Sequence, residues 1–181
     1  MSPRRGLTPE ERAGVLEHLA ASRDRMLAAV ESLTLEQWNF KPDADTWSAA
    51  ECCEHVTLVE SFVLRSVLEA PERTELPDVT GKEEIILQRV SVAFRKAAAP
   101  EQAQPKGRWP IEDLKEVFAG ARRASIDLAT GPDYPLRWKI VPHFALGALD
   151  GYQWLVFLGA HCDRHVRQLE AVKALPGFPG T

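Results

Sequence analysis

Two histidines lie one helical turn apart near the C-terminus, in the stretch HCDRHVRQLEAVKAL, where His161 and His165 follow a long apolar run. Residues at positions i and i+4 of a helix project from the same face. Two imidazoles at this spacing can therefore bind one divalent metal ion. The His-Glu-x-x-His helix of metalloproteases uses the same geometry, but here Cys, Asp and Arg separate the histidines, so the general-base glutamate is missing. The spacing alone is a weak signal, because surface helices often carry such pairs.

The neighbours of this pair indicate an interior position. Leu158 and Trp154 precede His161 by three and seven residues, which places them on the same helical face. An apolar face of this kind is expected to point into a helical bundle. Two buried imidazoles would then need two separate hydrogen-bond partners, whereas one metal ion satisfies both.

A third ligand has to come from elsewhere, and His55 is the best candidate because its apolar neighbours are expected to point inward. Three neutral histidines match the ligand set of an open catalytic site, in which water or substrate takes the remaining position. We expect His18 to be partly exposed and His143 to cap or pack locally. Cys52, three residues before His55, could add a thiolate, but a buried free cysteine is the commoner case. Cys162 is offset by about 100° from its neighbour His161 and is expected to face away from the metal.

Other polar residues near the histidines have competing explanations. Glu51 could be a ligand, but a capping box gives it a sufficient structural role. Gln168 and Arg164 could support the site, with Gln168 orienting an imidazole or contacting substrate, and a solvated helix face explains them nearly as well. Glu54 and Asp163 are adjacent or nearly adjacent to the candidate ligands and are expected to point elsewhere. No general base is identifiable.

Composition favours one ordinary globular domain over residues 1–181. Hydrophobic residues make up 45% and charged residues 27% of the 181, and the formal net charge is −4. The basic residues are scattered, which argues against a nucleic-acid partner. No apolar run approaches the roughly 18 residues of a membrane span, and the N-terminus lacks the apolar segment of a secretory signal. The three cysteines suggest no disulfide framework, so we expect a cytoplasmic protein.

The elements that position these residues are helical. Capping boxes begin two helices, at Thr8 with Glu11 and at Ser48 with Glu51, and Thr34 could cap a short turn. Strand signals are nearly absent. The predicted fold is an all-α four-helix bundle with long connecting loops and one extra helix in the middle. Helices are expected over residues 8–30, 46–70, 83–98, 110–130 and 149–175, and surface or irregular connections over residues 71–81, 100–110 and 131–147.

Two segments of the chain resemble the DinB-like superfamily. They are TWSAAECCEHV and LDGYQWLVFLGAHCDRHVRQLE, and the resemblance is closest to the branch of bacillithiol transferases and YfiT-type metal-dependent hydrolases. The resemblance covers most of the chain, although its middle is similar only in being helical. The positions that match the family pattern are Trp47, Ser48, Glu51, His55, His161, Arg164, His165 and Gln168.

This resemblance implies an up-down-down-up bundle, a homodimer, and a nickel or zinc ion held by His55, His161 and His165. Gln168, Trp154 and Trp47 would lie around the metal or line a substrate pocket. Family members with known chemistry transfer low-molecular-weight thiols or use them to isomerise substrates, and many members have no known activity. The chain is therefore expected to be a metal-dependent thiol transferase or hydrolase acting on a small molecule. Two alternatives remain open: a non-catalytic metal-binding bundle, and a plain bundle with buried histidines.

Overall fold

The structure is a computed structural model that describes residues 6–91, 99–131 and 134–180. It is mostly helical. The elements are α1 (Pro9–Val30), α2 (Leu35–Asn39), α3 (Ala49–Glu69), α4 (Lys82–Arg89), η1 (Glu101–Ala103), α5 (Ile111–Thr130), η2 (Leu136–Trp138), β1 (Ile140–His143), β2 (Gly147–Asp150) and α6 (Gly151–Lys173).

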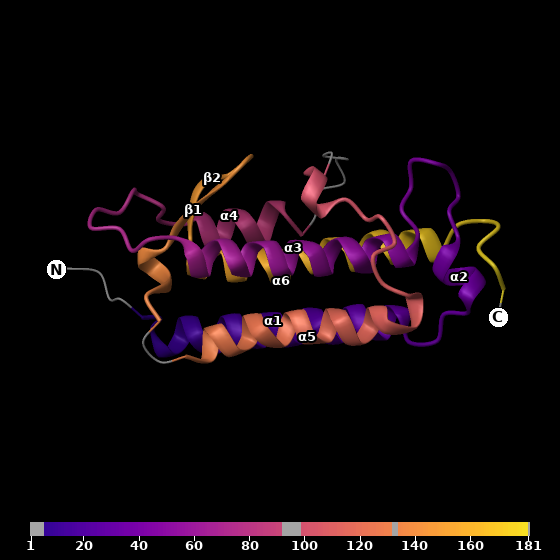
Figure 1. Ribbon diagram of the computed structural model, residues 1–181, viewed down its shortest axis with the longest axis horizontal. Helices are drawn as coiled ribbons and strands as arrows, with labels where there is room; N and C mark the ends of the chain where they lie inside the picture. Colours follow the sequence, from indigo (N-terminus) through magenta and orange to yellow (C-terminus); the bar gives the residue numbers. More distant parts are fainter. Residues whose placement is uncertain (1–5, 92–98, 132–133, 181) are drawn as a thin grey trace.

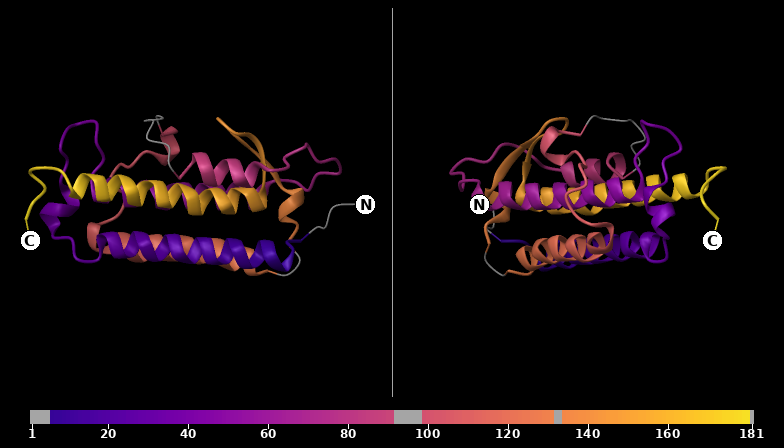
Figure 2. Two further views of the ribbon diagram at one scale, coloured as in Figure 1. Left: turned by 180° about the vertical axis from the view of Figure 1, so that it is seen from behind. Right: turned by 45° about the vertical axis from the view of Figure 1, so that its right-hand side comes forward.

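The four long helices form two layers (Figure 1). Helices α3 and α6 make one layer, and α1 and α5 make the other. Helix α1 packs most extensively on α6, and α3 packs most extensively on α5, which the two further views also show (Figure 2). Helix α4 and the β1–β2 hairpin cover the outer face of the α3–α6 layer. The apolar core lies between the layers and consists of two clusters of buried side chains, one with Leu19 and Leu155 and the other with Phe118.

The helix starts follow the predicted capping chemistry. The hydroxyls of Thr8, Thr34 and Ser48 each accept a hydrogen bond from the backbone N–H three residues later, and each helix has the reciprocal side-chain bond. These boxes satisfy backbone donors that a helix start leaves unpaired. A fourth box begins α6, where the Asp150 carboxylate accepts from the N–H of Gln153. The last helix therefore starts later than the sequence suggested.

A β-hairpin occupies part of the segment that was expected to be irregular, so that expectation was wrong for residues 140–147. Strands β1 and β2 pair antiparallel, with Val141 opposite Leu149. Each strand has four residues and β1 contains Pro142, which explains the weak strand signal. The hairpin depends on tertiary contacts: Lys82 Nζ donates to the carbonyls of Leu146 and Ala148.

The expected middle helix is found over only part of its predicted range. Helix α4 ends at Arg89, Val90 and Ser91 form a turn, and residues 92–98 of the prediction lie outside the described residues. Residues 71–75 are exposed as expected. Residues 100–110 are mostly exposed, but Ala103 is buried against α3. Within the described ranges, no helix is both long and apolar enough to cross a membrane.

One buried ion pair joins all four long helices. Arg122 of α5 donates through Nε and Nη2 to the two carboxylate oxygens of Glu60 on α3, at 2.7 and 2.9 Å. Its Nη1 donates to Ser22 Oγ and to the Leu19 carbonyl of α1, and Nη2 also reaches the Leu158 carbonyl of α6. Burial disfavours the charged guanidinium, but the Glu60 carboxylate outweighs this effect and raises the pKa of Arg122.

Candidate metal centre

The structure brings His55, His161 and His165 together between α3 and α6. One ring nitrogen from each lies within 4.8 Å of the other two. His161 Nε2 lies 3.2 Å from His55 Nε2 and 3.2 Å from His165 Nε2. The i, i+4 spacing on α6 aims the last two rings the same way, and α3 supplies the third ring from the neighbouring helix in the same layer.

The orientation of His55 is set by a backbone carbonyl. Its Nδ1 lies 2.6 Å from the carbonyl oxygen of Ala103 in η1. A carbonyl oxygen only accepts hydrogen bonds, so Nδ1 carries the proton and donates it. The Nε2 atom of His55 is then unprotonated, and its lone pair faces the other two imidazoles. Metal-binding histidines in proteins are usually held in this way.

The cluster is deeply buried, with His55, His161 and His165 only 5%, 6% and 2% exposed. Burial is the largest cause that lowers the pKa of each of these histidines. The neighbouring imidazoles and the positive charge of Arg164 lower the pKa of His161 further. The three rings are therefore neutral near pH 7, which is the state that binds metal ions.

Aromatic rings enclose the cluster. Trp47 stacks on His165 with ring centroids 5.9 Å apart, and its centroid lies 4.6 Å from that of His55. Phe157 stacks on His161 at 5.3 Å. Trp47 thus contacts two of the three candidate ligands. Phe157 was not foreseen as a neighbour of His161, although its position one turn before His161 would have indicated the contact.

Trp154 contacts the hairpin instead of the cluster. Its Nε1 donates to the Val141 carbonyl at 3.0 Å, and its ring packs on His143 and Phe157. Trp154 was expected to lie around the metal or to line a pocket beside it. In the structure the ring of Phe157 packs on both Trp154 and His161, so that Trp154 lies one ring further from the cluster.

The remaining candidates mostly have structural roles. Cys52 does not join the group of ligand atoms, and burial raises the pKa of its thiol to about 12. Cys162 faces away from the cluster, with Sγ 3.4 Å from the Ser22 carbonyl. Glu51 completes the α3 capping box and pairs with Lys41. Asp163 pairs with Arg25 of α1.

Glu54 also points away from the histidines, but its role was not foreseen. Its carboxylate accepts hydrogen bonds from the backbone N–H groups of Lys106, Gly107 and Arg108 and from the Arg108 guanidinium. Burial opposes ionisation of Glu54, but these hydrogen bonds outweigh it and lower the pKa of the carboxyl. The glycine in the sequence QPKGRWP was the available signal, since a left-handed turn exposes consecutive N–H groups.

Gln168 and the two other histidines lie close to their expected places. The Gln168 side chain lies beside His165 and favours its charged form, against the larger effect of burial on the pKa of His165. No partner lies in hydrogen-bond geometry with the buried Nδ1 of His165 in the described chain. His18 is partly exposed, with 23% of its side chain accessible. His143 caps its own turn, since its Nδ1 accepts from the N–H groups of Ala145 and Leu146.

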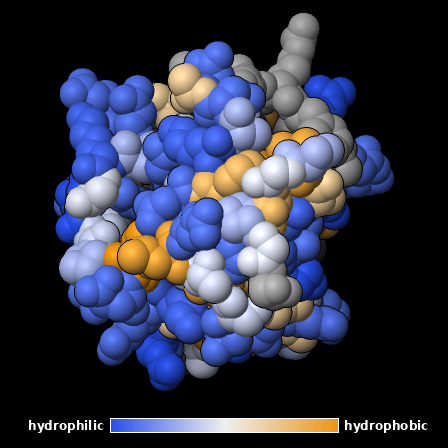
Figure 3. Space-filling view, turned by 90° about the vertical axis from the view of Figure 1, so that its right-hand side faces the viewer, coloured by the Kyte–Doolittle hydropathy of each residue, from blue (hydrophilic) through white to orange (hydrophobic). Residues whose placement is uncertain are grey.

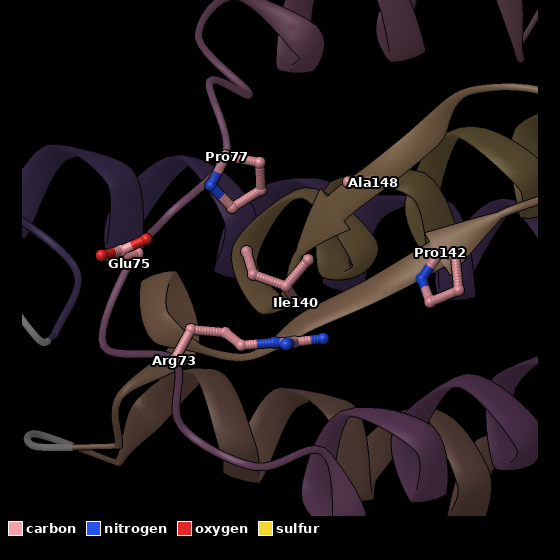
Figure 4. A pocket seen from close by; sticks show the side chains of 6 residues that line it. All are labelled: Arg73, Glu75, Pro77, Ile140, Pro142 and Ala148. Carbon is pink, nitrogen blue, oxygen red and sulfur yellow. The ribbon is translucent and has the colours of Figure 1, made fainter.

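Two surface pockets lie away from the histidines. The first, of about 380 Å³, lies between residues 73–77 and the outer face of the hairpin; in Figure 4 the Arg73 side chain extends along β1 while Glu75 points away. The second lies at the end of the bundle formed by α2 and the C-terminal residues, where Leu35 is 68% exposed. Figure 3 views this end and shows apolar side chains among hydrophilic ones. Neither pocket is lined by His55, His161 or His165.

The donor set fits a divalent metal ion. Three Nε2 atoms converge, and the Nδ1–H of His55 fixes the lone pair of its Nε2 toward the centre. Three imidazole nitrogens that face one another need a cation or a proton between them, because unprotonated Nε2 atoms only accept hydrogen bonds. Imidazole nitrogen suits zinc, nickel, copper and iron. Among the described residues, no cysteine or carboxylate joins the three histidines.

The fold and site together define a helical protein with a buried three-imidazole cluster shared by two of its long helices. The family model of the DinB superfamily matches residues 18–169, and the chain belongs to this superfamily. It is also similar to the uncharacterized protein YuaE of Bacillus subtilis (strain 168), at 24% identity over 149 residues, which cover 80% of this chain and 88% of that protein. No solved structure matches the chain.

Proposed function

We propose that this protein is a metal-dependent enzyme in which His55, His161 and His165 hold a divalent cation, zinc or nickel. The observation that carries the proposal is the convergence of the three Nε2 atoms, two of them 3.2 Å from the third. The reaction that we favour is transfer of a low-molecular-weight thiol, or hydrolysis, on a small-molecule substrate. The thiol chemistry is suggested by the superfamily, and the residues of the site are compatible with either reaction.

The ligand count supports catalysis over a purely structural metal. Structural zinc sites have four protein ligands, whereas catalytic sites have three and leave a position for water or substrate. Cys52 was the strongest candidate for a fourth ligand, and its buried thiol stays outside the group. A three-histidine set therefore leaves room for one exogenous molecule.

The side chains around the site have separate roles in this proposal. A bound dication would act as a Lewis acid and lower the pKa of a water or thiol brought beside it. His55, His161 and His165 hold that charge in place, and the Ala103 carbonyl fixes the ring of His55. Trp47 and Phe157 exclude bulk water from the His165 and His161 rings on which they stack. Exclusion of water strengthens electrostatic interactions inside the site.

Metal content is the direct test. Protein purified without an affinity tag should contain about one divalent ion per chain by elemental analysis. Separate replacements of His55, His161 and His165 by Ala should each remove most of this metal. His18→Ala is the matched control, because His18 is on α1 and outside the cluster. Equal metal content in the control and in the three variants would contradict the proposal.

A second candidate function is non-catalytic metal binding, favoured by the burial of the three rings under Trp47. Cobalt substitution separates the two functions. If the site has an open position, a small thiol or azide added to the cobalt-loaded protein will change its visible absorption spectrum. A spectrum that does not change at high thiol concentration would favour the non-catalytic function.

The family also suggests properties beyond the site. We propose that α1, α3, α5 and α6 form an up-down-down-up bundle, an order that the course of the ribbon in Figure 1 supports. We further propose one domain over residues 1–181, a homodimer and a cytoplasmic location. Sedimentation at micromolar concentration should give about twice the chain mass of 20.2 kDa, and a monomer would contradict the homodimer.

A further inference from the structure

A short segment, residues 100–109, lies across α3 next to the histidine cluster; we call it the strap. It contains η1 and ends just before α5. Two contacts attach it to consecutive residues of α3. The Ala103 carbonyl accepts from His55 Nδ1 at 2.6 Å, and three backbone N–H groups donate to Glu54 at 3.0, 2.8 and 3.2 Å.

The second contact is a built anion site that Glu54 fills. Successive N–H groups converge on one anion when a left-handed residue follows a right-handed one. Gly107 has φ +68°, in the left-handed region, and its N–H makes the shortest of the three backbone bonds to Glu54. The Arg108 guanidinium closes the site from the side, since Nη1 donates both to Glu54 and to the Gln104 carbonyl. Glu54 itself is 3% exposed.

These two contacts act on the same short piece of chain. Ala103 and Lys106 are three residues apart, and the bond from the Arg108 guanidinium to the Gln104 carbonyl closes the turn between them. Ala103 is itself buried, 3% exposed, where η1 packs against α3. The carbonyl that accepts from His55 Nδ1 and the N–H groups that bind Glu54 therefore belong to one short piece of chain.

We infer that Glu54 is a positioning residue for the metal centre: by holding residues 106–108, it places the Ala103 carbonyl on His55 Nδ1 and so keeps the His55 Nε2 lone pair directed at His161 and His165. The inference rests on the proposed metal site. It adds a residue that the ligand pattern does not contain, and it explains why a buried carboxylate stands directly before a candidate ligand while pointing away from it.

The inference makes a prediction that needs no metal. At a slightly alkaline pH, ring nitrogen–proton correlation NMR of the metal-free protein should show His55 protonated at Nδ1 and unprotonated at Nε2. In Glu54→Gln, which removes the charge but keeps the shape, a substantial fraction of His55 should carry its proton on Nε2 instead. Gly107→Ala should act in the same direction, because the φ of +68° at this position is strained for alanine. The space around Gly107 is open, so the added Cβ strains the backbone without a steric clash.

The second readout is zinc affinity, measured by competition with a chelator. Both variants should lose about 10- to 100-fold, the usual effect of removing a partner that orients a metal-binding histidine. Thr8→Ala is the matched control: it removes the α1 cap and so weakens the fold without touching the strap. Circular dichroism should show unchanged helix content in all three variants.

The outcomes separate the inference from the proposed function. Unchanged His55 tautomer and unchanged zinc affinity in both strap variants would overturn the inference, as would equal losses in Thr8→Ala. If the wild-type protein binds no metal, the proposed function fails, while a tautomer change confined to Glu54→Gln and Gly107→Ala still supports the positioning role.

Discussion

Replacing Arg122 by Met should be among the most destabilising single changes in this protein. Arg122 is fully buried, and its guanidinium makes two bonds to Glu60 and one each to Ser22, Leu19 and Leu158. Methionine is unbranched and apolar, so it fills the space of the Arg122 stem but not that of the guanidinium. It leaves the Glu60 carboxylate without its two charged donors, in a position with no exposure to water.

The expected magnitude follows from that uncompensated charge. Removing one partner of a buried ion pair costs about 3–5 kcal/mol in the free energy of unfolding. Domains are typically stable by about 5–15 kcal/mol, so the variant should fold but be weak. With a urea slope of about 1–3 kcal/mol per molar for a small protein, the unfolding midpoint should fall by more than about 1 M.

Urea unfolding followed by circular dichroism measures this change, and a double mutant identifies its cause. Arg122→Met with Glu60→Leu removes both charges, and an apolar replacement of a buried pair is often close to neutral. The double variant should therefore be more stable than Arg122→Met alone. Arg23→Met is the control, since Arg23 pairs with Asp24 at the surface. This variant should lose less than about 1 kcal/mol of unfolding free energy.

Two results would refute this reasoning. One is a loss below about 1 kcal/mol for Arg122→Met, which would mean that water or another group solvates Glu60. The other is a double variant that is no more stable than Arg122→Met, which would show that lost packing, and not the unpaired charge, sets the cost.

Three further predictions concern other positions. Gly159→Ala should destabilise the α1–α6 contact by about 1–3 kcal/mol, because the new Cβ would lie 1.7 Å from His18 Cδ2, and adding His18→Ala should recover most of the loss in urea unfolding. Burial lowers the pKa of His143 from 6.5 to about 4, so its contribution to stability is complete above pH 6.5 and is lost as the pH falls toward 4. The wild type should lose about 1.4 kcal/mol of unfolding free energy for each unit by which the pKa of His143 is lowered. His143→Asn retains an acceptor that does not titrate, so its unfolding free energy should fall less steeply over this pH range. His161→Ala should lose most of the bound metal but keep its helix content, because apolar packing dominates bundle stability.

Each of these predictions has a contrary outcome. A Gly159→Ala protein as stable as the wild type would show that His18 moves aside freely. Parallel pH profiles for the wild type and His143→Asn would show that His143 titrates normally in the folded protein. Loss of helical circular dichroism in His161→Ala would show that the cluster, and not apolar packing, holds the bundle together.

Local sequence predicted those parts of the protein that depend on near neighbours in the chain. The capping boxes at Thr8, Thr34 and Ser48 begin helices as expected, since a cap needs only residues three apart. The pairing of His161 with His165 likewise follows from helical period. The choice of His55 as third histidine came from the expected inward face of its helix and from family resemblance, and the structure brings that ring to the other two.

Tertiary structure decided the polar contacts that hold distant segments together. The strap contacts between Glu54 and residues 106–108 span more than 50 positions, and the Arg122–Glu60 pair spans 62. A lone Glu or Arg in an amphipathic helix normally indicates a solvated face, so its sequence context gives no sign that it is buried. The hairpin was missed because its four-residue strands have little intrinsic preference for β structure. They are held by distant side chains, the Lys82 ammonium and the indole N–H of Trp154. Periodicity and caps therefore determine which helices form, whereas the buried polar contacts between the helices and around the candidate metal centre form only when the folded chain brings their partners together.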